Sequence, residues 1–115
     1  MLNPPSPDIL SRIPRLYATQ GAPSEDTIIH GRFYLARCNW FAVEFDGEDE
    51  FFGYVCVGDP VKAEWGHFSL AELKAVMVRS PVIQIPTGQR MGTLLAQVEW
   101  DACWQPKPFN RIHRP

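Results

Sequence analysis

The seven residues from Phe51 to Val57, with the sequence FFGYVCV, constrain the fold of this chain more than any other segment. Six of the seven are apolar or aromatic, and only Gly53 interrupts the run. In an extended strand, neighbouring side chains point to opposite faces. A strand of this composition has to bury both faces, which indicates either the central strand of three or a strand that is covered on both sides.

Two segments before it also have the character of strands. Residues 28–35 and residues 40–45 alternate apolar with polar or small side chains, as strands in a sheet do. In the second segment we expect Phe41, Val43 and Phe45 on one face. An Asp-Gly turn signal separates the second segment from the third. Together the three segments predict an antiparallel meander.

A helix is predicted after the meander. Ser69 and Glu72 form a capping box, in which the hydroxyl accepts a hydrogen bond from a free amide and the carboxylate reaches back to the cap. Apolar residues then recur at helical spacing to about Val78, and Pro81 ends the helix. Residues 91–100 fit a helix or a strand. We therefore assign an α+β fold, a small antiparallel sheet of three to five strands with one main helix packed on it.

The chain is expected to divide into one domain and two tails. Residues 1–8 carry three prolines and are predicted to form a loose N-terminal tail. Residues 9–108 hold the predicted strands and the helix, and we assign them to a single α+β domain. Residues 109–115 are predicted to form a C-terminal tail. The length of 115 residues suits a single domain.

The composition argues against several classes of protein. A formal net charge of −2 does not favour a general electrostatic grip on nucleic acid, which needs clustered Lys and Arg. Three widely spaced cysteines predict neither a disulfide framework nor a zinc site, so we expect no metal and no cofactor. The N-terminal residues lack the features of a secretory signal, and no stretch is long enough to span a bilayer. We therefore expect a cytoplasmic protein with free thiols that does not contact a membrane.

A series of short sequence blocks between Leu16 and Pro108 carries a resemblance to a known family. The blocks are Leu16-Tyr17-Ala18-Thr19, Glu25-Asp26, Trp40, Glu44, Phe52-Gly53-Tyr54-Val55, Gly66-His67-Phe68-Ser69-Leu70 with Glu72-Leu73, and Asp101 ahead of Trp104-Gln105-Pro106-Lys107-Pro108. In this order they resemble the family catalogued as domain of unknown function 2958. Its members are small bacterial proteins of plasmids, phages and other mobile elements, so the resemblance implies a mobile-element context and no catalytic residues.

The chain departs from the pattern of that family in two places. His67 stands where the family usually has Tyr, and the stretch from about Gln84 to Gln97 is longer than the corresponding region.

An acidic cluster lies at the turn between the second and third predicted strands. It places five carboxylates within seven residues, namely Glu44, Asp46, Glu48, Asp49 and Glu50. The spacing does not fit a calcium-binding loop, because the glycine comes too early. Two interpretations stay open: a hairpin tip that its charge keeps solvated, or a mimic of phosphate groups that meets a basic surface of a partner.

We predict that the acidic hairpin belongs to a partner-binding surface. Tyr54, Trp65 and His67 are added to the five carboxylates, because exposed aromatic residues often anchor an interface. The predicted function is that of a non-enzymatic interaction protein of a mobile genetic element, which binds a protein or nucleoprotein complex of the host. An anti-defence role, the inhibition of a CRISPR or restriction complex, would fit this context and the size of the chain.

Two other functions are carried as alternatives. One is a small enzyme that uses Cys38 and His67 with a carboxylate, although the spacing of these residues does not favour it. The other is a nucleic-acid-binding accessory factor that combines aromatic stacking with the basic residues Lys107, Arg111 and Arg114.

Overall fold

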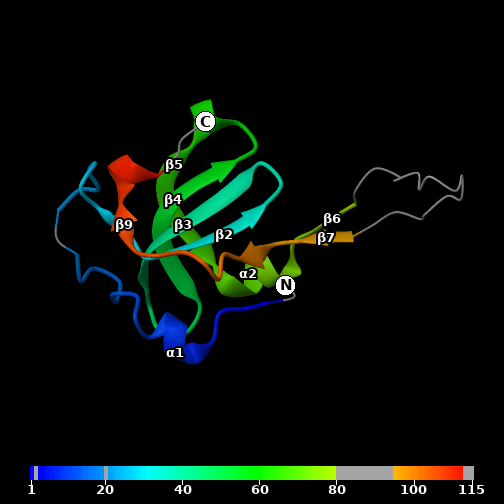
Figure 1. Cartoon of the computed structure of the whole chain (residues 1–115), viewed down its shortest axis with the longest axis horizontal. Helices are drawn as coiled ribbons and strands as arrows, with labels where there is room; N and C mark the ends of the chain where they lie inside the picture. Colours follow the sequence, from blue (N-terminus) through cyan, green and yellow to red (C-terminus); the bar gives the residue numbers. More distant parts are fainter. Residues whose placement is uncertain (2, 20, 80–94, 113–115) are drawn as a thin grey trace, which may run out of the picture.

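A five-stranded antiparallel sheet forms the body of the protein (Figure 1). The computed structural model describes residues 1, 3–19, 21–79 and 95–112. The strands lie in the spatial order β5-β4-β3-β2-β8. Their bounds are β2 (Gly31–Leu35), β3 (Cys38–Phe45), β4 (Glu50–Val57), β5 (Glu64–Ser69) and β8 (Glu99–Trp100).

The predicted antiparallel meander is present. Strands β2, β3, β4 and β5 follow one another along the chain, and each pairs with the next. Strand β4 lies between β3 and β5, and apolar clusters cover both of its faces, as the run from Phe51 to Val57 predicts. Of the three predicted strands, however, β3 is the central one, because it pairs with both β2 and β4. Strand β4 is covered by a strand on its other side because β5 adds to the sheet there.

The two faces of the sheet carry separate apolar clusters. We call the face that carries Phe33, Phe51 and Trp100 the first face. The second face carries Phe41 and Phe109. Because the strands bury side chains on both faces, the N-terminal and C-terminal segments of the chain serve as part of the cover for the sheet.

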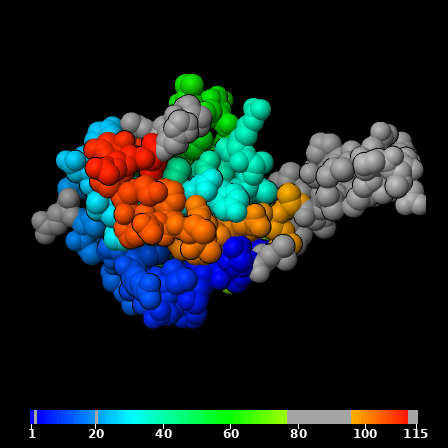
Figure 2. Space-filling model, in the orientation of Figure 1, coloured from blue at the N-terminus to red at the C-terminus, as the bar shows by residue number. Residues whose placement is uncertain are grey.

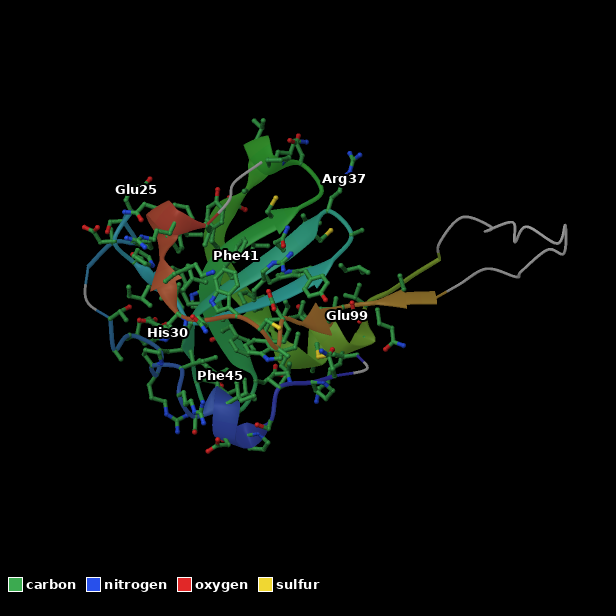
Figure 3. All side chains as sticks on the ribbon, viewed as in Figure 1. Glu25, His30, Arg37, Phe41, Phe45 and Glu99 are labelled. Atoms are coloured by element: carbon green, nitrogen blue, oxygen red, sulfur yellow. The ribbon has the colours of Figure 1, made fainter. Side chains whose placement is uncertain are left out.

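A β-bulge in β3 changes the direction of its last residues. Ala42 pairs with Gly53 and Glu44 pairs with Phe52, so that Val43 is the extra residue between them. Phe41 and Val43 therefore lie on the second face, whereas Phe45 packs in the cluster of the first face (Figure 3). The prediction that Phe41, Val43 and Phe45 share one face is wrong for Phe45, since the bulge breaks the alternation of the strand.

The helical part of the fold is smaller than the sequence predicts. Helix α2 (Leu70–Ala75) begins at the predicted cap, where the Ser69 hydroxyl accepts from the Glu72 amide. It buries Leu70 and Leu73 in the cluster of the first face. The backbone of Val76 is already extended, so the helix ends three residues before the predicted Val78. A helix of six residues is not the main covering layer that we expected.

Strands take the place of the missing helical turn. Strand β6 (Met77–Arg79) pairs with β7 (Leu95–Gln97) in a two-stranded ribbon that projects from the body of the molecule (Figure 1). Of the predicted ambiguous segment 91–100, residues 95–97 and 99–100 are strands. Residues 91–94 lie outside the described part of the chain.

The N-terminal segment is attached to the sheet and is not the loose tail that we predicted for residues 1–8. The Asn3 side chain donates to the Trp100 carbonyl oxygen at 2.8 Å and accepts from the Trp100 amide at 3.2 Å. Pro5 is buried, and helix α1 (Pro7–Leu10) follows with Ser6 as its cap. The Asn3 side chain thus satisfies both backbone polar groups of Trp100 in the edge strand β8.

The C-terminal segment also belongs to the domain. Strand β9 (Lys107–Pro108) pairs with β1 (Ile28–Ile29), and a 3₁₀ turn η2 (Phe109–Arg111) follows it. Phe109 and Ile112 are buried in the cluster of the second face. The prediction of a tail from residue 109 is therefore wrong as far as Ile112, because these apolar side chains complete the core. A second 3₁₀ turn, η1 (Pro60–Lys62), joins β4 to β5.

Within the described residues, no helix has both the length and the apolar character needed to cross a membrane.

Candidate functional site

Two hollows lie on the second face of the sheet, one with a wall from the C-terminal segment and the other with a wall from residues between Tyr17 and Ile28. Figure 2 shows the C-terminal segment in orange and red on the surface, beside the cyan strands β2 and β3. The first hollow, which we call the basic groove, encloses about 500 Å³ and is lined by Arg32, Asn39, Tyr54, Trp104, Lys107 and Arg111 among others. The second, the acidic cavity, encloses about 460 Å³ and is lined by Thr19, Asp26, His30, Glu44, Phe52 and His67 among others.

The acidic cluster of the sequence does not form a single surface. Glu44 lies within β3 and is only 4% exposed, so it is not part of the exposed hairpin tip. Its carboxylate accepts hydrogen bonds from the Tyr17 amide at 3.0 Å and the Thr19 amide at 2.9 Å. The Thr19 hydroxyl donates to the same carboxylate. Glu44 therefore anchors the segment of Tyr17 and Thr19 to the second face.

The surroundings of Glu44 keep its carboxylate ionised. Burial acts to raise the pKa of Glu44, but the hydrogen bonds from Thr19 and Tyr17 outweigh this effect. The positive charge that His67 can carry acts in the same direction as these hydrogen bonds. The pKa of Glu44 is thus held below its ordinary value.

Two other carboxylates of the cluster bind the backbone of their own loop and of a helix. One oxygen of Asp46 accepts from the amides of Glu48, Asp49 and Glu50 at 2.7, 2.8 and 3.1 Å. The Glu48 and Asp49 amides in particular lower the pKa of Asp46. Asp49 accepts from the Ala71 amide at 2.8 Å and from the Ser69 hydroxyl, so it caps helix α2 together with Ser69.

Glu48 and Glu50 are the members of the cluster that keep exposed side chains free of such backbone hydrogen bonds within the described residues. Glu50 faces His67, with 3.8 Å between its Oε2 and Nδ1 of the histidine. The hairpin thus offers a partner much less negative charge than the sequence indicates.

The aromatic members of the predicted surface pack against one another on the second face. Tyr54 and Trp65 are cross-strand neighbours with ring centroids 5.2 Å apart. Phe109 packs against both rings, at 4.7 Å from Tyr54 and 4.8 Å from Trp65. His67 lines the acidic cavity instead. The structure therefore places Tyr54 in the basic groove, His67 in the acidic cavity, and Trp65 in the packed cluster of the second face.

Arg32 is held rigidly at one wall of the basic groove. Its Nε donates to Asn39 Oδ1 at 2.8 Å, and its Nη1 forms an ion pair with Asp101 at 3.1 Å. The guanidinium also lies over the Tyr34 ring, 4.5 Å from its centroid. These three contacts fix the guanidinium group in place. Because arginine has five N–H donors, some of them stay without an acceptor among the described residues.

The opposite wall of the basic groove comes from the C-terminal segment. The Lys107 ammonium lies over the Trp104 ring at 4.2 Å from its centroid. Trp104 is fixed by a hydrogen bond of 3.0 Å from its indole nitrogen to the Ile29 carbonyl oxygen. Arg111 lies in the 3₁₀ turn and has an exposed side chain. Three cations thus line one groove, whereas Arg37 points away from the sheet at the tip of the β2–β3 turn (Figure 3).

The residues of the enzyme alternative are not brought together. Cys38 packs against the cluster of the first face, whereas His67 lines the acidic cavity on the second face. Their partners on β4, Val57 and Phe52, lie five residues apart, which is roughly 16 Å along a strand. Cys56 is buried, and burial raises the pKa of its thiol. The three described cysteines are free, and no cluster of three potential metal ligands occurs among the described residues.

Sequence reasoning considered Lys107 and Arg111 but missed Arg32, Asn39 and Trp104 as lining residues. The signal available for Arg32 was its place on the polar side of β2. Its contact with Asp101 joins two residues that are 69 positions apart, and the local pattern of the sequence does not predict a contact over that separation.

Comparisons with known proteins give no identification, since no family model, no curated protein and no solved structure matches this chain.

Proposed function

We propose that this protein is a non-enzymatic binding protein that takes single-stranded nucleic acid in the basic groove. One observation carries the proposal: Arg32, Lys107 and Arg111 converge on a groove that also presents Tyr54 and Trp104, and no acidic side chain is among its lining residues. Charge and aromatic surface at one place are the two requirements for holding a strand without a fixed sequence. This choice is the nucleic-acid alternative raised by the sequence, with a different set of residues.

The chemistry of the groove suits an unpaired strand better than a duplex. Phosphate groups would accept hydrogen bonds from the exposed Arg111, from Lys107 and from the free donors of Arg32. Because Arg32 is already immobilised, little side-chain entropy is lost when it binds an anion. Bases have to be unpaired to reach Tyr54 and Trp104, and a base that stacks on Trp104 takes the place of the Lys107 ammonium over that ring. Stacking on such rings contributes about 1–3 kcal/mol per base. Because the chain as a whole carries a formal net charge of −2, the attraction for phosphate depends on the local cluster of cations in the groove.

Binding of a protein partner through the acidic hairpin has less support. Glu44 is buried, and the carboxylates of Asp46 and Asp49 are engaged with backbone amides. A surface that meets basic residues needs carboxylates whose oxygens are free. The mobile-element context and the anti-defence role stay predictions, and a pull-down from host cells tests them.

The test is a titration of fluorescently labelled single strands of DNA and RNA, and of the matching duplex, at low and at physiological salt. The double variant K107Q/R111Q removes two cations of the groove. Lys74→Gln is the matched control, because Lys74 is exposed on α2, whose buried residues face the first face.

We expect the unmodified protein to bind single strands more tightly than the duplex. In K107Q/R111Q the affinity should depend less steeply on salt. The negative slope of log affinity against log salt should become shallower by about 0.7 for each phosphate group that the variant no longer neutralises. Lys74→Gln should leave the slope unchanged. Equal affinity of K107Q/R111Q and the unmodified protein for every strand, with both proteins folded, would refute the proposal.

A further inference from the structure

The acidic cavity differs from the basic groove in charge. It lies between the segment of residues 17–28 and the second face of the sheet, and no Lys or Arg is among its lining residues. Glu44 and Asp26 line it, and Glu50 lies beside the lining residue His67. The Asp26 carboxylate is exposed, and no described residue binds it. An anionic ligand would be repelled by this set of groups, and a cation would be attracted.

The sheet places an aromatic ring between these polar groups. Phe52 pairs with Glu44 on one side and with His67 on the other, so all three side chains point from the second face into the cavity. The Phe52 and His67 rings lie 5.2 Å apart. The bulge at Val43 sets this register, since it brings Glu44 opposite Phe52. An aromatic ring in a negatively charged hollow attracts an organic ammonium group, because the ring quadrupole and the Coulomb attraction act in the same direction.

Two further side chains add to the fit. The half-buried ring of His30 has no hydrogen-bond partner among the described residues, and burial lowers its pKa, so the ring is neutral at neutral pH. It offers an acceptor without adding positive charge. Tyr17 lines the cavity with a side chain that is 80% exposed, on a backbone held at a φ of 65° by the Glu44 anchor.

We propose that the acidic cavity binds a small organic cation of the alkylammonium class, between Phe52 and the exposed Asp26 carboxylate. The buried, ionised Glu44 adds negative charge to the cavity but makes no direct bond to the cation, because its oxygens are engaged by Tyr17 and Thr19. The site is separate from the basic groove, since the two hollows share no lining residue within the described part of the chain. The proposal does not depend on the binding of nucleic acid.

The probe is choline, with 3,3-dimethylbutan-1-ol as its neutral isostere, and the readout is the NMR chemical shifts of the backbone amides. Choline should shift the signals of Thr19, His30, Phe52 and His67 in a saturable manner. Its affinity should exceed that of the neutral alcohol by about fivefold to thirtyfold, the range expected for a partly desolvated cation–π contact. Equal affinities of the two probes, or no saturable shift with choline, would overturn the proposal.

Two variants and their controls assign the site. Asp26→Asn should weaken choline binding severalfold, whereas Glu48→Gln, the same loss of charge at the exposed hairpin tip, should not. Phe52→Leu keeps an apolar side chain and should weaken choline more than the neutral alcohol. Choline binding should be retained in K107Q/R111Q. Full choline affinity in folded Asp26→Asn and Phe52→Leu would also overturn the proposal.

Discussion

At the scale of single residues, Glu44 shows how tertiary contacts redefine a side chain. In the sequence it is the first of five clustered carboxylates, and in the fold it is a buried acceptor of three hydrogen bonds. The segment that contains Tyr17 and Thr19 depends on it, and this segment forms part of the wall of the acidic cavity.

We expect Glu44→Gln to lower the free energy of unfolding by about 1–3 kcal/mol, because one amide oxygen replaces two carboxylate oxygens and an NH₂ group then faces the donors of Tyr17 and Thr19. Urea denaturation measures the change. Glu48→Gln is the control and should stay within about 0.5 kcal/mol of the unmodified protein. A Glu44 variant as stable as the control would show that these hydrogen bonds contribute little.

Asp49 and Ser69 act together at the start of helix α2. Replacing either one, in Asp49→Asn or Ser69→Ala, should destabilise the fold by about 1 kcal/mol. Because the Ser69 hydroxyl donates to Asp49, the double variant should lose less than the sum of the two single losses. A double-mutant cycle from denaturant melts tests this coupling, and strict additivity would contradict it.

Neutralising Glu48, Asp49 and Glu50 together is also expected to reduce stability, because the triple variant loses the Asp49 cap. If the hairpin tip were only a solvated loop, removing its charges would leave stability unchanged or raise it slightly.

At the scale of the elements, the pairing of β3 with β4 leaves no room for a side chain at Gly53. A Cβ atom at this position would lie 1.7 Å from the Phe41 carbonyl oxygen. Gly66 is the partner of Gly53 on β5, and a Cβ atom there would meet nothing within 4 Å. The glycine in the apolar run of β4 thus serves close approach of the two backbones, and it needs no ligand to explain it.

These two glycines form a matched pair of variants. Gly53→Ala should destabilise the protein by about 3 kcal/mol or more, because the strands have to separate to accept the methyl group. Gly66→Ala should change the stability by less than about 1 kcal/mol. Thermal denaturation followed by circular dichroism compares them. Similar midpoints for both variants would refute the close packing at Gly53.

At the scale of the whole molecule, three groups make stability depend on pH in the same direction. Folding lowers the pKa of His30 from an ordinary 6.5 by burial. It also lowers that of Glu44 from 4.5, where hydrogen bonds outweigh burial, and that of Asp46 from 3.8, where backbone amides bind the carboxylate. The folded chain therefore binds fewer protons at these groups than the unfolded chain does, so stability rises with pH across each range.

We expect the free energy of unfolding to be highest between pH 6.5 and about pH 9, to begin to fall below pH 6.5 as His30 is forced to titrate, and to fall further below pH 4.5. Above about pH 9 it should fall again, because burial raises the pKa of the Cys56 thiol above its ordinary 9.0 and the folded chain then binds more protons than the unfolded chain. Urea melts at a series of pH values measure this profile. His30→Gln should remove the part of the decline that begins near pH 6.5 and leave the more acidic part in place. A profile in which stability rises on acidification from pH 6.5 would contradict a lowered pKa of His30 in the folded protein.

The sequence alone determined those features that depend on neighbouring residues. The alternation of residues 28–35 and 40–45 and the apolar run of β4 predict the meander, and Ser69 marks the start of helix α2. These signals are local, because the side-chain period of a strand and the free amides of a helix end are set by the backbone itself.

Only the tertiary structure decided what depends on distant segments. The bulge at Val43 turned Glu44 toward Tyr17 and Thr19, and no feature of the local pattern predicts where a strand takes an extra residue. The described parts of the two predicted tails belong to the domain, because Asn3 contacts Trp100, 97 positions away, and because Phe109 packs on the second face. Both hollows arise from the same cause, since each has one wall from the sheet and the other from a segment that is distant in the sequence and covers the second face.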